Sequence, residues 1–197
     1  AALGRDPALG RGYPGGPAPG RAAPRRRVVS ATLDDPEAAA DAFWAFSLKV
    51  YARPEVKEAC LAFQEQGGDV NIGLFAVWTA RQGRDPSAVI SKAGALGRGW
   101  AGSVVKPLRA ARDALKPAPD YVDAQAGAAL RQQILSAELE AERLQQRALA
   151  PLAASGPAST EPPGALAVAA LERLAREAGL GYDARAFVEI VSSAAET

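Results

Sequence analysis

The sequence predicts an all-α protein, a compact bundle of about six to eight helices behind a disordered N-terminal tail. Three observations support this prediction. Apolar side chains recur every three or four residues from Asp35 onward, no stretch alternates strictly as a strand does, and proline and glycine stand where helices would begin and end. Of the 197 residues, 48% are hydrophobic, and many of these are alanine, which favours helices with small contact surfaces.

Composition divides the chain into four parts. Residues 1–30 contain Gly, Pro, Ala and Arg with almost no large apolar side chain, so we expect a disordered basic tail. The tail is interpreted either as an arm for RNA, DNA or anionic lipid or as an unselected extension. Residues 34–150 carry the pattern of the bundle core, 151–164 have the composition of a linker, and 165–197 are expected to form a helical hairpin docked on the bundle.

The bundle core is predicted to begin at Asp34 or Asp35, where an Asx cap precedes Pro36 at the first helical position. The apolar face of this first helix consists of Ala40, Phe43, Trp44, Ser47, Leu48 and Tyr51. Pro54 ends the first helix and starts a second, which runs through Phe63. The two helices are expected to form a tight hairpin.

A third helix is predicted to follow a glycine pair. Gly67 and Gly68 are expected to supply the left-handed backbone that closes the second helix. Asp69 is then placed to cap the third helix, which Gly83 ends. Its apolar residues include Val70, Leu74, Val77 and Trp78, so we expect it to be the most buried helix.

Two helices are predicted between Asp85 and Pro117. Asp85 and Pro86 repeat the cap-and-proline signal and open a helix of about ten residues that ends among glycines. These glycines are Gly94, Gly97 and Gly99. From Trp100 a further amphipathic helix is expected, bent at Pro107.

The last part of the chain predicts one long helix and two short ones. The long helix spans residues 121–149 and carries a heptad-like stripe, too short to predict a coiled coil. The stripe consists of Leu130, Ile134, Ala137, Ala141, Leu144 and Ala148. The two short helices are expected at 165–178 and 183–195.

The residue types exclude several classes of chemistry. The chain has no histidine and a single cysteine, Cys60, so it cannot form a Ser-His-Asp or Cys-His nucleophile. The glycine-bearing stretch from Gly94 to Gly102 contains no Walker lysine motif and follows no predicted strand, which argues against a phosphate-binding loop. We expect Cys60 to pack in the core, and we expect neither a metal nor a cofactor.

Four residues are candidates for ligand contact. Asp69 and Asn71 start the third helix, and Asn71 must face solvent or find partners because its amide lies in an apolar segment. Support of the helix cap is the simpler role and ligand contact the alternative. Trp44 and Trp100, with neighbouring aromatic residues, could line an apolar pocket or form ordinary core.

A basic stretch from Lys92 to Lys116 is the strongest candidate for a partner surface. Its candidate residues are Lys106, Arg109 and Arg112. Their charge could meet an acidic protein face or phosphates, or could complement the chain's own acidic residues from Glu138 to Glu142. Nucleic acid is a possible partner but is not favoured.

Three stretches of the sequence resemble a proteobacterial family of small proteins known only as a domain of unknown function. They read FWAFSLKVYARPEVKEACLAFQEQ, DVNIGLFAVW and, later, VVKPLRAARDALK. The resemblance covers about residues 41–149. It implies no activity, cofactor or catalytic residue. The positions that match the family's pattern are Trp44, Ser47, Tyr51, Pro54, Cys60, Gln64, Asp69, Asn71, Trp78, Trp100 and Arg109.

No catalytic residue and no metal ligand is assigned from the sequence. The leading hypothesis is a non-enzymatic, cytoplasmic bacterial module that binds a protein partner through the basic stretch or the Trp44/Asn71 region. The first alternative is a binding protein for a small apolar or amphipathic ligand, and the second is a carboxylate-dependent enzyme centred on Asp69 and Asn71. No segment has the roughly 20 apolar residues needed to span a bilayer, and the oligomeric state stays open.

Overall fold

The computed structural model describes residues 33–196, all of which are helical or loop; they contain no β-strand. The predicted all-α class is therefore confirmed, while the predicted tail, residues 1–30, lies outside the described residues. The α-helices are α1 (Pro36–Tyr51), α2 (Pro54–Glu65), α3 (Val70–Arg81), α4 (Ile90–Trp100), α5 (Lys106–Asp113), α6 (Ala124–Leu149), α7 (Pro163–Ala178) and α8 (Ala184–Glu196).

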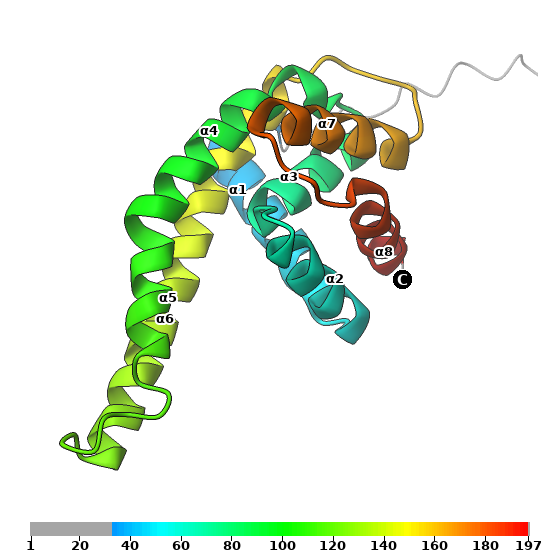
Figure 1. Cartoon of the computed structure of the whole chain (residues 1–197). Helices are drawn as coiled ribbons and strands as arrows, with labels where there is room; N and C mark the ends of the chain where they lie inside the picture. Colours follow the sequence, from blue (N-terminus) through cyan, green and yellow to red (C-terminus); the bar gives the residue numbers. More distant parts are fainter. Residues whose placement is uncertain (1–32, 197) are drawn as a thin grey trace, which may run out of the picture.

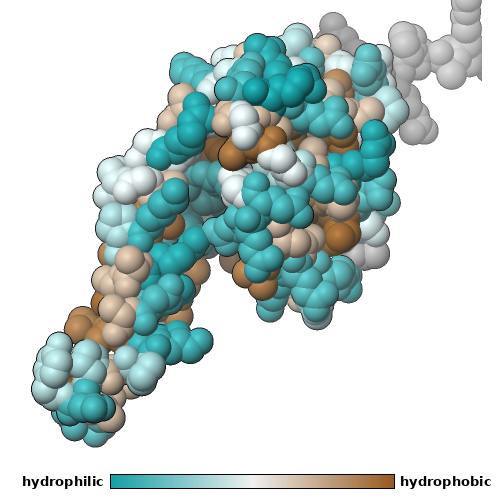
Figure 2. Space-filling view, in the orientation of Figure 1, coloured by the Kyte–Doolittle hydropathy of each residue, from teal (hydrophilic) through white to brown (hydrophobic). Residues whose placement is uncertain are grey.

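The helices form a body and an arm (Figure 1). The body gathers α1, α2, α3, α7 and α8 around one hydrophobic core. The arm is an antiparallel pair, α5 beside the first half of α6, that projects from the body. Figure 2 shows the surface hollowed where the arm leaves the body.

The predicted caps of the first helices are confirmed. Asp35 accepts a hydrogen bond of 3.0 Å from the backbone N–H of Glu37, with Pro36 in the first turn of α1. Asp69 caps α3 by accepting from the N–H groups of two residues in its first turn. Of the glycine pair, only Gly67 has the left-handed backbone (φ 89°) that closes α2.

The expected break among Gly94, Gly97 and Gly99 is wrong, because the helix continues through them into α5. Two of these glycines serve close packing instead. A Cβ on Gly94 would lie 2.6 Å from Leu174 of α7, and one on Gly97 would lie 2.9 Å from the carboxylate of Asp69. The cap at Asp85 is real, but it opens a short 3₁₀ turn, Pro86–Ala88, ahead of α4.

A π-helical turn, Ala101–Val105, joins α4 to α5. Within it the N–H of Lys106 donates to the carbonyl of Ala101, five residues back. Pro107 has no N–H, and its ring would crowd the carbonyl four residues before it in a regular α-helix. The wider π-helical turn therefore stands where Pro107 interrupts the regular hydrogen-bond pattern of the helix.

The core centres on α3, as predicted. Phe43 of α1 stacks on Trp78 of α3, with ring centroids 5.0 Å apart. Phe63 of α2 stacks on Phe187 of α8 at 4.4 Å. Cys60 is buried in the same core, which confirms the prediction for this residue.

The heptad-like stripe of α6 is not its buried face. Leu130, Ala137, Leu144 and Ala148 are exposed. The residues that α6 buries are Gly127, Glu138, Ala141, Gln145, Gln146 and Leu149. Polar side chains occupy this face because α6 meets the arginines of α5 and the polar start of α3, where apolar residues would leave charges unpaired.

Residues 151–164 connect α6 to α7 along the body. They begin within a 3₁₀ helix, Ala150–Ser155, and the backbone N–H of Ser159 donates to the carbonyl of Gly83 at 2.9 Å. Helix α7 packs on α3, and α8 packs on α2, so both belong to the same core. The proposed division into bundle, linker and docked hairpin stays a prediction.

Candidate functional site

A cleft of about 680 Å³ opens between the arm and the body. Its walls come from α1, the end of α2 and the α2–α3 turn, the first turn of α3, the end of α4, the π-helical turn, the start of α5 and the second half of α6. Segments far apart in the sequence therefore meet around one cavity. Its size lies within the range of small-molecule sites, about 300 to 1,000 Å³.

A row of hydrogen-bonded side chains, which we call the amide ladder, runs along the inner wall of the cleft. The ladder consists of Ser47, Gln146, Asn71, Gln145 and Asp69. Nε2 of Gln146 donates to Oδ1 of Asn71 at 2.7 Å, and Nδ2 of Asn71 donates to Oε1 of Gln145 at 2.9 Å. Nε2 of Gln145 donates to Oδ2 of Asp69 at 2.9 Å.

The two ends of the ladder are anchored differently. At one end, the Ser47 hydroxyl lies 3.0 Å from Oε1 of Gln146 and 3.1 Å from the carbonyl of Phe43, and its one proton serves one of them at a time. At the other end, Oδ1 of Asp69 accepts from the N–H groups of Asn71 and Ile72. Because Asp69 accepts at both oxygens, it sets the direction of every amide in the ladder.

Burial is the largest influence on the pKa values of Asp69 and Glu142, two acidic groups of the cleft. It raises the pKa of the Asp69 carboxyl, against the hydrogen bonds that the carboxylate accepts. It also raises the pKa of Glu142, against the attraction of Arg109. Burial raises the pKa of the Tyr51 phenol as well, so Tyr51 presents a neutral hydroxyl.

The apolar part of the cleft lies on α1, the π-helical turn and α6. It includes Trp44, Leu48, Val105 and Leu139. The guanidinium carbon of Arg143 lies 5.7 Å from the centre of the Trp44 ring, a cation–π contact that holds the indole in place. Leu139 is 51% exposed although it lines the cleft, so apolar surface is available to a ligand there.

Two arginines of the basic stretch pair within the chain. Nε of Arg109 donates to Oε1 of Glu138 at 2.7 Å, and Arg112 pairs with Oε2 of the same carboxylate at 3.0 Å. Arg109 also reaches Glu142 at 3.2 Å. Glu138 is buried, so these pairs compensate a carboxylate that would otherwise be costly to desolvate. The intramolecular alternative is thus realised for Arg109 and Arg112.

Arg98 and Lys106 differ from these arginines. Both line the cleft and both are exposed. Neither side chain makes a hydrogen bond or an ion pair with another residue in the part of the chain that the structure describes. Their charges are therefore available to a bound group.

The comparisons with known proteins agree with the resemblance seen in the sequence. Residues 42–149 match the family described as Protein of unknown function (DUF2390). The chain belongs to this family. Neither a curated protein nor a solved structure matches the chain.

The DUF2390 match contains every residue that lines the cleft. It ends at the last residue of α6, so α7 and α8 lie outside it. Several positions that carry the resemblance lie on the cleft wall, and these are Trp44, Ser47, Tyr51, Gln64, Asp69, Asn71 and Arg109. The family pattern and the cleft therefore coincide.

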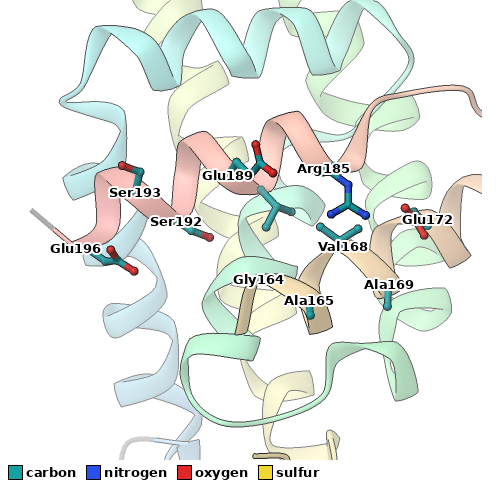
Figure 3. A pocket seen from close by; sticks show the side chains of 11 residues that line it. Gly164, Ala165, Val168, Ala169, Glu172, Arg185, Glu189, Ser192, Ser193 and Glu196 are labelled. Carbon is teal, nitrogen blue, oxygen red and sulfur yellow. The ribbon is translucent and has the colours of Figure 1, made fainter. Parts of the chain in front are cut away.

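A second, more open groove of about 650 Å³ lies outside the DUF2390 match, between α7 and α8 (Figure 3). Small side chains of α7, such as Ala165 and Ala169, line one side. Arg185, Glu189 and Ser192 of α8 line the other side. The groove contains none of the candidate residues from the sequence.

Five of the seven candidate residues line the cleft: Trp44, Asp69, Asn71, Lys106 and Arg109. The other two, Trp100 and Arg112, do not line it. The indole N–H of Trp100 donates to the carbonyl of Ala141 at 2.9 Å and so joins α4 to α6. Arg112 pairs with Glu138 and with Asp113.

Sequence reasoning missed Gln145 and Gln146, which complete the amide ladder. Their signal was weak, because glutamine is common on exposed helix faces. The spacing of Ala141, Gln145 and Leu149 puts them on one side of α6, and that side is the buried one.

Neither a metal cluster nor a membrane-spanning helix is found between residues 33 and 196. No group of three or more acidic or cysteine side chains there could hold a metal ion. No helix there is long and apolar enough to cross a bilayer.

Proposed function

We propose that the cleft binds a small amphipathic molecule, which was the first alternative from the sequence. The observation that supports it most is the composition of one cavity, with exposed apolar side chains on one wall and the amide ladder on another. Ligand sites combine an apolar surface with a few oriented polar groups in this way.

The amide ladder supplies the oriented groups. Each primary amide has two N–H donors, and Asn71, Gln145 and Gln146 each use one of them within the ladder. One donor on each side chain is therefore left for solvent or a ligand. Because Asp69 fixes the direction of the ladder, these groups need no reorganisation on binding, which lowers the entropic cost.

The π-helical turn supports the same proposal. Ala101 and Val105 of this turn line the cleft directly. Single π-helical turns occur frequently at functional sites, because they redirect the side chains that follow. Here the residues that follow include Lys106 and Arg109, which also line the cleft.

Native mass spectrometry of protein purified without denaturation tests this function. We expect a co-purifying small molecule in the wild-type protein. Ala101→Trp, which fills the cleft, should abolish the adduct, whereas Ala110→Trp on an exposed part of α5 should retain it. Only the mass of the unliganded chain in all three proteins would contradict the proposal.

Binding of a protein partner, the leading hypothesis from the sequence, is a second candidate. It is favoured by two exposed apolar side chains of α6, Leu130 and Leu144. The basic stretch supports this hypothesis less than the sequence suggested, since Arg109 and Arg112 pair within the chain. Replacing both leucines with lysine should release a genuine partner in a pull-down without changing the melting temperature.

A further inference from the structure

The charges of the cleft define its ligand more closely. This inference rests on the proposed function. We propose that the ligand is an amphipathic anion, an alkyl or aryl body ending in a carboxylate or a similar negative group, whose charge is held by Arg98 and Lys106.

The first step concerns the sign of the ligand's charge. The acidic groups of the cleft are already engaged, Asp69 by three hydrogen-bond donors and Glu142 by Arg109. Arg98 and Lys106 have no such partner among residues 33–196. A ligand cation would compete with existing contacts, whereas a ligand anion would find two free cations and unused amide donors.

The second step concerns the position of the anionic group. Arg98 precedes the π-helical turn and Lys106 follows it, so both cations stand on the α4–α5 wall of the cleft. The guanidinium of Arg98 now lies back along α4, with Nη1 3.3 Å from the position of a Cβ on Gly94. It can turn toward the cleft without breaking an ion pair.

The third step concerns the body of the ligand. Trp44 and Leu48 of α1 and Leu139 of α6 form the apolar part of the cleft. Leu48 and Leu139 are more than half exposed in the unliganded chain, at 55% and 51%. Covering them would stabilise the complex by about 25 cal/mol for each Å² of apolar surface removed from water. The anion thus needs an apolar chain to bind well.

Calorimetric titration with four probes tests this inference: octanoate, octanol, octylammonium and acetate. We expect octanoate to bind most tightly, octanol less tightly, and acetate and octylammonium not measurably. Arg98→Ala combined with Lys106→Ala should weaken octanoate about tenfold and leave octanol unchanged. Lys92→Ala with Lys116→Ala removes two exposed cations outside the cleft and serves as the matched control.

The outcomes separate this inference from the proposed function. If octanol binds as tightly as octanoate and the double variant weakens neither, the inference is overturned while the proposed function stands. Tightest binding of octylammonium would also overturn it, and would assign the charge recognition to Asp69 and Glu142. If neither octanol nor octanoate binds, the proposed function fails with it.

Discussion

Gln145 donates a hydrogen bond of 2.9 Å to the carboxylate of Asp69, 76 positions earlier in the chain. The bond joins the middle of α6 to the cap of α3, and it ends the amide ladder on an ionisable group. The Asp69 side chain thereby caps α3, orients three amides and lines the cleft.

Replacing Gln145 should cost far more than replacing a neighbouring glutamine. Gln145→Leu leaves an amide donor of Asn71 and an oxygen of Asp69 without their partners, so we expect a loss of about 2 to 4 kcal/mol in the free energy of unfolding. Gln133→Leu, on an exposed part of α6, should change it by less than about 0.5 kcal/mol. Urea denaturation of both variants gives the comparison, and equal losses would show that the ladder contributes nothing.

Asp69→Asn should be destabilising although asparagine is a good helix cap. Its new amide nitrogen would face Nε2 of Gln145, donor against donor, so either this bond is lost or the ladder reverses. We expect a loss of about 1 to 2 kcal/mol, measured by urea denaturation. Double-mutant cycles with Gln145→Leu should show strong coupling, and simple additivity would contradict the account.

Alanine substitutions at two glycines of α4, Gly97 and Gly99, should change stability in opposite directions. A Cβ on Gly97 would meet both the Asp69 carboxylate and Ile72 at 2.9 Å, so Gly97→Ala should destabilise by about 1 to 3 kcal/mol. A Cβ on Gly99 would meet nothing within 4 Å, so Gly99→Ala should stabilise by about 0.5 to 1 kcal/mol. Thermal unfolding reports both signs, and a stabilising Gly97→Ala would refute the close approach of α4 to α3.

These glycines also show what the sequence could predict. The caps at Asp35 and Asp69 were predictable because an Asx–Pro pair or a Gly–Gly–Asp turn acts through its immediate neighbours. The continuity of α4 into α5 was not, because the role of Gly97 depends on α3 lying against it. Propensity predicted an end where packing required a small residue.

The candidate site was likewise predictable only where the signal was local in the sequence. Asn71 stood out because an amide in an apolar helix needs a partner, yet the partners, Gln145 and Gln146, lie far along the chain. Lys106 and Arg109 have the same charge in the sequence. Only the structure distinguishes Arg109, which is paired with Glu138, from Lys106, which is not.

Because Arg109 and Arg112 share the carboxylate of Glu138, the stability losses from replacing them should not be additive. Arg109→Ala or Arg112→Ala alone leaves one arginine on this buried carboxylate, so each should cost about 1 kcal/mol. The double variant leaves Glu138 uncompensated and should cost about 3 to 5 kcal/mol. Arg98→Ala, an exposed arginine without such a pair, is the control. A double variant no worse than the sum of the single variants would argue against the shared pair.

Glu142 should contribute to the pH dependence of the free energy of unfolding. Burial raises its pKa in the folded chain, so the folded state holds the proton to higher pH than the unfolded state does. Its contribution to stability is therefore greatest at low pH and decreases as pH rises from the ordinary carboxyl range through the raised pKa. Relative to Glu142→Gln, the wild-type protein should lose stability across that window, and an increase would contradict the raised pKa.

The most direct test of the ligand cleft is a two-dimensional ¹H–¹⁵N NMR titration with octanoate that follows side-chain signals. We predict that the NH₂ signals of Asn71, Gln145 and Gln146 and the indole N–H of Trp44 shift together and saturate, while those of Gln132 and Gln133 stay in place. Saturating shifts confined to α7 and α8, or no saturating shift at the ladder, would contradict a binding site between the arm and the body.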